Sequence, residues 1–190
     1  MSQLEFHPVT PERWYDLETL FGKNGAYANC WCMWWRLKRS EFDKQTGQKK
    51  KEALKAIVDA GDVPGILAFA NGQPIAWCSV APREDFSALE RSTTLKRVDD
   101  KPVWSIVCFF VAKPYRRQGL MVKFLRAAID YAKANGAKII EGYPVEPREE
   151  GLSDSSGFTG IASAFQEVGF VEVLRRSKNR PIMRYFIEEQ

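Results

Sequence analysis

The sequence lacks several features that would place a protein in a membrane, outside the cell or around a metal ion. It contains no run of about 18 apolar residues, so we expect no helix that spans a membrane. Residues 1–5 lack the basic and then apolar segments of a secretory signal. There is one histidine, His7, and there are four cysteines. We therefore expect a cytoplasmic protein with reduced thiols and without a resident metal ion.

The sequence also lacks a strong excess of one charge. Lys and Arg number 28 and Asp and Glu number 24, which gives a net charge of +4. A domain that binds nucleic acid usually carries a larger, one-sided basic surface, so we expect no nucleic-acid partner and keep such a domain only as a third, less favoured alternative. A smaller anionic ligand, such as a nucleotide-like cofactor, needs no such excess.

The composition is that of a globular protein, because 45% of the 190 residues are hydrophobic and 27% are charged. We find neither a repeat nor a linker, so we expect a single domain over residues 1–190. Alternation, helical periodicity and turn residues predict seven strands and four helices. The expected strands are 4–9, 66–70, 74–80, 103–111, 137–143, 170–175 and 182–187, and the expected helices are 10–22, 48–60, 120–134 and 159–168, with a helical turn at 86–90.

Two connections indicate how the strands are arranged. Asn71-Gly72 lies between two apolar segments and predicts a tight hairpin. Strand 103–111, helix 120–134 and strand 137–143 follow one another, which predicts a parallel βαβ unit with a right-handed crossover. We therefore expect an α/β (α+β) fold with a mixed, mostly antiparallel sheet of about seven strands and one parallel βαβ unit.

The junction between strand 103–111 and the helix that begins at Leu120 carries the clearest chemical signal. A helix N-terminus presents unpaired N–H groups that suit a phosphate. Gly119 in this turn lets the backbone approach a ligand closely. Arg116 and Arg117 add charged donors at the rim. The segment therefore predicts a diphosphate-binding turn, and the alternative is a basic loop in which Gly119 only serves the turn.

From Val103 to Phe170 the chain resembles the GNAT superfamily of acyl-CoA-dependent N-acetyltransferases. The family signature is Gln or Arg, two residues, Gly, one residue, and Gly or Ala, after a hydrophobic strand. Here the segment reads Arg116-Arg117-Gln118-Gly119-Leu120-Met121, in which Met121 departs from the signature. A later family motif, an aromatic residue four positions before Gly-Phe, corresponds to Phe165. Segments 29–33, 141–144 and 180–184 are similar to a bacterial subgroup of the superfamily.

The resemblance implies an enzyme that transfers an acetyl group from acetyl-CoA to an amine of a small molecule or peptide by direct attack. It implies that the backbone of Phe109, Phe110 and Val111 binds the pantetheine arm and that Phe165 lies at the cofactor. The diphosphate contacts that it implies are Arg116, Arg117, Gln118, Gly119, Leu120 and Met121. The alternative is a CoA-binding regulatory module of the same fold that has lost turnover.

The resemblance does not transfer a general base or acid. Many family members have a tyrosine where this chain has Phe165, and some have a glutamate where it has Ser105. From their position at the end of strand 137–143, we take Glu141 and Tyr143 as candidate catalytic residues. The alternatives are a solvated carboxylate for Glu141 and a half-buried strand aromatic for Tyr143.

The segment 27–36 is rich in tryptophan and cysteine. Trp31, Trp34 and Trp35 either line an acceptor pocket or pack as a small core, and a second subunit of a homodimer is another surface that could cover them. Cys30-x-Cys32 has one residue too few for the usual zinc pair. We therefore interpret these cysteines as buried thiols, with a redox or acyl-accepting role as the alternative.

Overall fold

The computed structural model describes residues 4–147 and 157–188, which form one seven-stranded sheet. The order across the sheet is β1-β2-β3-β4-β5-β7-β6, and every neighbouring pair is antiparallel except β4 and β5. The strands are β1 (Leu4–Pro8), β2 (Ile66–Ala70), β3 (Gln73–Pro82), β4 (Trp104–Val111), β5 (Ile139–Gly142), β6 (Val171–Arg175) and β7 (Pro181–Phe186). The expected fold class and all seven expected strands are confirmed.

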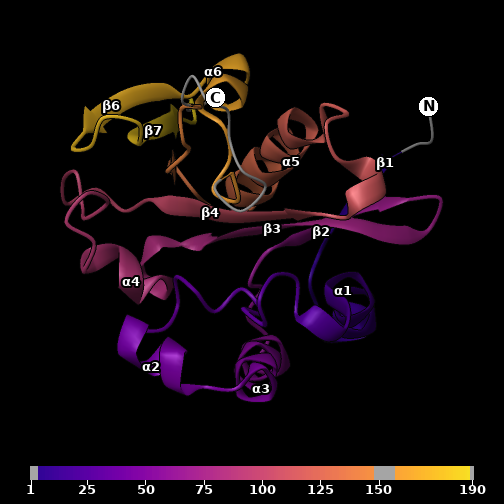
Figure 1. Cartoon of the computed structure of the whole chain (residues 1–190). Coiled ribbons are helices and arrows are strands. Elements are labelled where there is room, and N and C mark those ends of the chain that lie inside the picture. The colour runs from indigo at the N-terminus through magenta and orange to yellow at the C-terminus, as the bar shows by residue number, and fades with distance from the viewer. Residues whose placement is uncertain (1–3, 148–156, 189–190) are drawn as a thin grey trace.

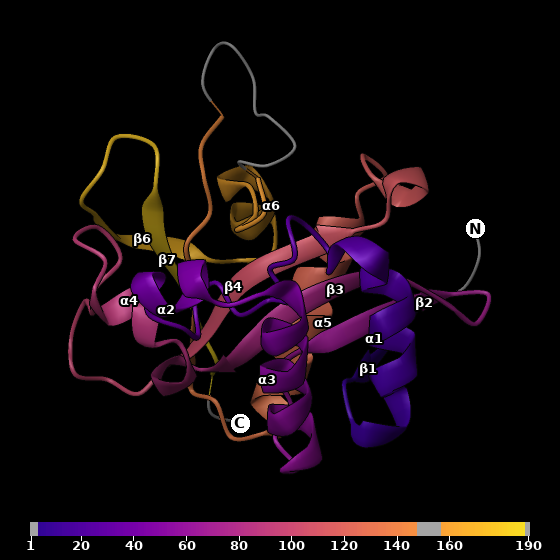
Figure 2. The same ribbon diagram turned by 60° about the horizontal axis from the view of Figure 1, so that its bottom comes forward.

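Helices cover both faces of the sheet (Figure 1). One face carries α5 and α6, and the other carries α1, α2, α3 and α4 (Figures 1 and 2). The helices are α1 (Trp14–Phe21), α2 (Arg39–Lys44), α3 (Gly47–Asp59), α4 (Ser87–Glu90), α5 (Leu120–Ala134) and α6 (Ala162–Glu167). Separate apolar clusters lie under the two sets of helices, so the sheet is the middle of three layers.

The longest helix, α5, follows β4 and positions the expected cofactor turn. Its apolar residues recur on one face, and Phe124, Leu125, Ala128 and Ala132 are fully buried against the sheet. Burial of a side chain such as Phe124 contributes about 2–3 kcal/mol. The N-terminus of α5 is thereby fixed relative to β4.

The sequence predicted four of the six α-helices in the described part of the chain, and the helical turn expected at 86–90 corresponds to α4. It missed α2, which has six residues, too few to show a helical period. Within residues 4–147 and 157–188, no helix combines the length and apolar character that crossing a bilayer requires. The same residues contain no group of three or more His, Cys, Asp or Glu side chains arranged to hold a metal ion.

Candidate active site

The parallel strands β4 and β5 separate soon after they meet. They pair only over Trp104 to Ile106, opposite Ile140 to Gly142, where β5 ends. β4 continues for five more residues to Val111, and its register with β3 shifts between Ser79 and Val80. This shift leaves one extra residue on β4, which bends a strand locally. One edge of β4 beyond Ile106 is therefore free of β5, as a ligand that binds like an added strand requires.

The backbone of β4 presents alternate residues to this edge. The N–H of Ala112 donates to Ile75 on the β3 side, whereas the N–H of Phe109 donates to the carbonyl of Phe158 at 2.6 Å. Because the direction alternates along a strand, Phe109 and Val111 face the free edge and Phe110 faces β3. The backbone groups of Phe110 therefore point toward the neighbouring strand, and the pantetheine contacts expected on the free edge would come from Phe109 and Val111.

The edge is not bare in the described structure. Besides the Phe109–Phe158 bond, the carbonyl of Val111 accepts a hydrogen bond from Arg116 Nε at 2.9 Å. Gly160 and Ile161 continue the covering segment, since Gly160 bonds to Val145 and Ile161 forms a parallel bridge with Val145. Sequence reasoning missed Phe158, because nothing in its local pattern indicates a contact with a strand 49 residues earlier.

The turn before α5 has the geometry that a diphosphate needs. Gly119 is the N-cap of α5, with φ 70° and ψ 11°, and Arg117 also has a positive φ of 60°. A Cβ placed on Gly119 would meet no atom within 4 Å. The first N–H groups of α5 have no carbonyl partner within the helix. Arg117, Gln118 and Gly119 are exposed, so the turn is open to solvent.

Not every expected residue of this turn is equally accessible. Leu120 is 7% exposed and packs in the core, and Met121 is half-buried against the same cluster. Their contribution to a ligand site is therefore limited to their backbone N–H groups. Arg116 is half-buried and already bonded to Val111, while Arg117 is the freely exposed guanidinium at the rim.

The expected catalytic pair, Glu141 and Tyr143, lies in a buried ionic network. Glu141 is fully buried, and its Oε1 accepts hydrogen bonds from Arg83 at 3.0 Å and from the Tyr143 hydroxyl at 2.7 Å. Its Oε2 accepts from Arg184 Nε at 2.7 Å. Both carboxylate oxygens are therefore engaged and shielded from solvent. The geometry argues against Glu141 as the general base and assigns it to a structural ion pair.

Tyr143 is fully buried at the same place. Its hydroxyl lies 2.8 Å from the Ser105 hydroxyl and also accepts a hydrogen bond from Arg83. Burial and the neighbouring Glu141 carboxylate raise the pKa of Tyr143 well above its usual value, so the hydroxyl stays protonated. Since it is enclosed and donates to Glu141, the structure places it in the network and not at an open site.

Asp99 extends this network toward the surface through Arg184. Two hydrogen bonds of 2.7 and 3.0 Å join the two side chains, and the guanidinium lowers the pKa of Asp99 to about 2. Arg83 also bonds to the carbonyl of Leu95. The network thus ties the long β3–β4 connection to β5 and β7. Sequence reasoning missed Arg83 and Arg184 as partners because they lie 58 and 43 residues from Glu141.

Similarity to known proteins agrees with this geometry. The profile of the acetyltransferase (GNAT) family matches residues 31–149. The chain belongs to the GNAT family. No curated protein matches the sequence.

Solved structures of GNAT-type acetyltransferases share the fold. A GNAT-family acetyltransferase from Streptococcus agalactiae has a TM-score of 0.56 and 12% identity, covering 100% of this chain and 99% of its own. The PaiA N-acetyltransferase of Thermoplasma acidophilum, in complex with coenzyme A, has a TM-score of 0.53 and 13% identity, with 97% and 99% covered. An aminoglycoside N-acetyltransferase in complex with CoA has a TM-score of 0.56 and 15% identity, with 94% of each chain covered. At these identities the likeness shows the fold.

Phe165, at the position where many GNAT members have a tyrosine, belongs to the core of the protein. It is fully buried and packs edge-on against Phe170 at 4.9 Å and Phe109 at 6.3 Å between ring centroids. Its ring lies against Gly142, the last residue of β5. Phe165 therefore fills the space where β4 and β5 separate, and its contact with a cofactor stays a prediction.

We expect Gly142→Ala to destabilise the protein by about 1–3 kcal/mol, because the added Cβ would collide with the buried ring of Phe165. Denaturant unfolding measures this change. The double variant Gly142→Ala with Phe165→Leu removes the colliding ring, so the two losses should be less than additive. Additive losses would contradict the direct contact.

The three tryptophans of segment 27–36 point to different places. Trp31 is 6% exposed and packs on Phe21. Trp34 is 37% exposed and lies beneath the guanidinium of Arg39. Trp35 is half-buried, and its ring stacks on Phe158. The tryptophans therefore do not form one acceptor pocket, and most of their surface is covered by this chain itself.

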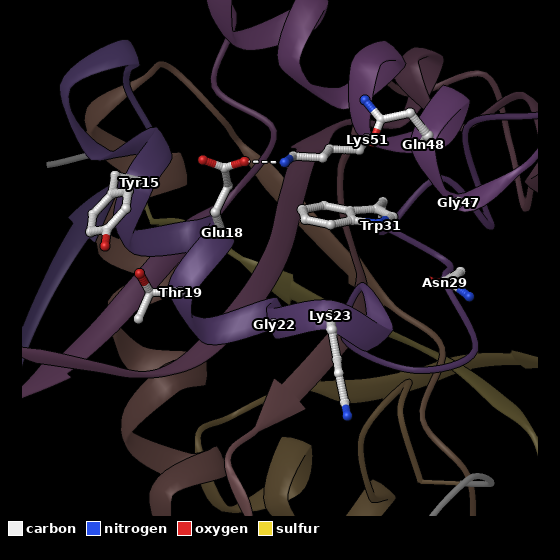
Figure 3. Close-up of a pocket in the computed structure, with 10 residues that line it drawn as sticks. All are labelled: Tyr15, Glu18, Thr19, Gly22, Lys23, Asn29, Trp31, Gly47, Gln48 and Lys51. Carbon is white, nitrogen blue, oxygen red and sulfur yellow. Dashed lines mark ion pairs between the residues drawn. The ribbon is translucent and has the colours of Figure 1, made fainter.

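A cavity of about 540 Å³ opens between α1 and the start of α3 (Figure 3). Trp31 is the one expected substrate-binding residue that lines it, and Glu18 and Lys51 form an ion pair beside its ring. None of the residues of the turn before α5 lines this cavity. It therefore lies apart from the expected diphosphate site, on the face that carries α1 and α3. The full lining is Tyr15, Glu18, Thr19, Gly22, Lys23, Asn29, Trp31, Gly47, Gln48 and Lys51.

Proposed function

We propose that this GNAT protein is an N-acetyltransferase that uses acetyl-CoA and acetylates an amine of a small molecule or peptide. The open turn at Gly119 carries the proposal. A diphosphate can approach the first N–H groups of α5 there because no Cβ or other atom fills the space. The exposed Arg117 guanidinium adds a charged donor. Two of the similar structures contain coenzyme A, which supports the choice of cofactor.

The free edge of β4 offers polar groups for the pantetheine arm. An arm beside β4 would replace the carbonyl of Phe158 as the partner of the Phe109 N–H, and such an exchange changes the free energy little. The Thr159 hydroxyl is fully buried and has no hydrogen-bond partner among the described residues. Buried polar groups are rarely left unpaired, so this hydroxyl is a second candidate contact for the arm.

Acetyl-CoA would supply an activated acetyl group for attack by a neutral amine. The contribution of the chain is mainly positional: the start of α5 holds the diphosphate, and β4 orients the arm. We place the acceptor amine on the face of the sheet that carries α1 and α3, opposite the face that carries α5. We assign proton removal to bound water, because Glu141 already accepts hydrogen bonds on both oxygens and is fully buried.

A CoA-binding module without turnover is the second candidate function. Phe165 has no hydroxyl to protonate a leaving thiolate, and Glu141 is unavailable as a base. These two observations favour a protein that binds the cofactor and does not transfer its acetyl group. The two candidates differ in one measurable property, the release of free thiol from acetyl-CoA.

Calorimetry with coenzyme A and a thiol-release assay with acetyl-CoA separate the candidates. We expect binding at one site per chain and thiol release with at least one member of a panel of polyamines, amino sugars and peptide amines. Binding without release for the whole panel would favour the module. An absence of binding would contradict both candidates, because each rests on the turn before α5.

A further inference from the structure

Three of the four cysteines converge between the loop before α2 and the central strand. Cys30 and Cys32 belong to the loop, and Cys108 belongs to β4. The Sγ atoms of Cys32 and Cys108 lie 3.8 Å apart, although 76 positions separate them in the sequence. A disulfide needs a sulfur–sulfur distance of about 2.05 Å, so the two atoms are within a short movement of bonding.

The loop is held in a backbone conformation that side-chain-bearing residues rarely adopt. Ala28, Asn29, Trp31 and Cys32 all have φ values between 42° and 57°. Each such residue costs on the order of 1 kcal/mol and persists only where surrounding contacts enforce it. Packing of Trp31 on Phe21, at 5.5 Å between ring centroids, provides such a contact. The strained loop therefore fixes the two cysteines at β4.

The three thiols differ in exposure and in charge. Cys30 and Cys108 are half-buried, while Cys32 is 5% exposed. A hydrogen bond from the Cys32 thiol, helped by backbone N–H groups, lowers the pKa of Cys30 to about 6. Burial raises the pKa of Cys32 well above its usual value. The lowered pKa increases the share of Cys30 that is thiolate, the form that reacts with peroxides, whereas Cys32 stays a thiol.

We propose that Cys30, Cys32 and Cys108 form an oxidation site in which a peroxide joins Cys32 and Cys108 in a reversible disulfide by way of Cys30. The Cys30 thiolate attacks hydrogen peroxide, the O–O bond breaks, and a sulfenic acid and water form after protonation. The Cys32 sulfur displaces the hydroxyl as a second water and forms a Cys30–Cys32 disulfide. Cys108 then attacks Cys32 and releases the Cys30 thiolate. Two thiols and one peroxide thus give one disulfide and two waters.

The last exchange is favoured by the chemistry of the leaving group. A thiol of low pKa leaves faster in thiol–disulfide exchange, and Cys30 is the acidic member of the trio. The product ties the loop to β4 directly before Phe109, at the edge where β4 and β5 have separated. This inference does not depend on the proposed acetyl transfer, because it concerns only thiols of this chain.

The test is peptide mapping of the full chain after exposure to hydrogen peroxide and blocking of the remaining thiols. We expect the tryptic peptide 24–36, which contains Cys30 and Cys32, to be linked to peptide 98–116, which contains Cys108. Dithiothreitol should abolish the link. Cys78 is fully buried in the cluster under α5 and α6, and its peptide 56–83 should stay unlinked.

Serine variants test the order of the steps. Cys108→Ser should retain an internal Cys30–Cys32 disulfide in peptide 24–36. Cys30→Ser should slow the link between the two peptides on the order of tenfold at neutral pH. Cys78→Ser is the matched control and should behave like the unmodified protein. An unlinked unmodified protein, an unchanged rate in Cys30→Ser, or equal linking of Cys78 would each overturn the proposal, and none of these results bears on coenzyme A binding.

Discussion

Replacing Gly119 with valine should weaken the binding of coenzyme A at least tenfold. The space that the new side chain enters is open in the structure, and it is the space through which a diphosphate would reach the N–H groups of α5. The positive φ of 70° at this position also disfavours a β-branched residue. Isothermal titration of both proteins with coenzyme A measures the difference in affinity.

Gly136 offers a matched control at the other end of the same helix. It also has a positive φ, 85°, and a Cβ there would also meet no atom within 4 Å. Gly136→Val should therefore lose similar stability through backbone strain and keep its affinity for coenzyme A. Equal affinities in the two variants would contradict the role of Gly119 in diphosphate binding.

Replacing Glu141 with glutamine should lower the free energy of unfolding by about 3 kcal/mol. The carboxylate is fully buried and compensates Arg83 and Arg184, which are 2% and 3% exposed. Glu90 and Asp99, which also pair with these two arginines, are partly exposed, so the variant removes the fully buried partner and weakens the compensation of both charges in a low dielectric. For a protein of this size the loss corresponds to a fall in Tm of roughly 6–12 °C. Thermal unfolding of both proteins measures it.

Glu172→Gln is the control for an ion pair at the surface. Glu172 pairs with Arg175 on β6, where both side chains are partly exposed, so its loss should cost about 1 kcal/mol or less. The prediction for Glu141 also separates a structural role from a catalytic one. A Glu141→Gln protein with normal stability and strongly reduced thiol release would restore Glu141 as the general base.

The parts that the sequence predicted are those with a local signal. The seven strands show alternation or long apolar runs, and the hairpin at Asn71-Gly72 and the turn at Gly119 use residues that favour a positive φ. The order of strand, helix and strand around α5 predicted the parallel pair of β4 and β5. Each of these local patterns lies within about 20 residues, so one sequence is enough to detect it.

The parts that the sequence did not predict depend on contacts between distant segments. Glu141 looks like a polar residue at the end of a strand until Arg83 and Arg184 are placed on either side of it. The approach of Cys32 to Cys108 likewise results from folding the loop onto β4. Burial changes the chemistry of such groups, and burial is a property of the assembled fold.

A crystal structure of the protein with coenzyme A tests the central claim most directly. We predict diphosphate oxygens within hydrogen-bond distance of the N–H groups of Gly119 and Leu120, and a Phe109 N–H that has exchanged the carbonyl of Phe158 for the pantetheine arm. A diphosphate bound elsewhere on the chain, with the bond between Phe109 and Phe158 intact, would contradict the claim.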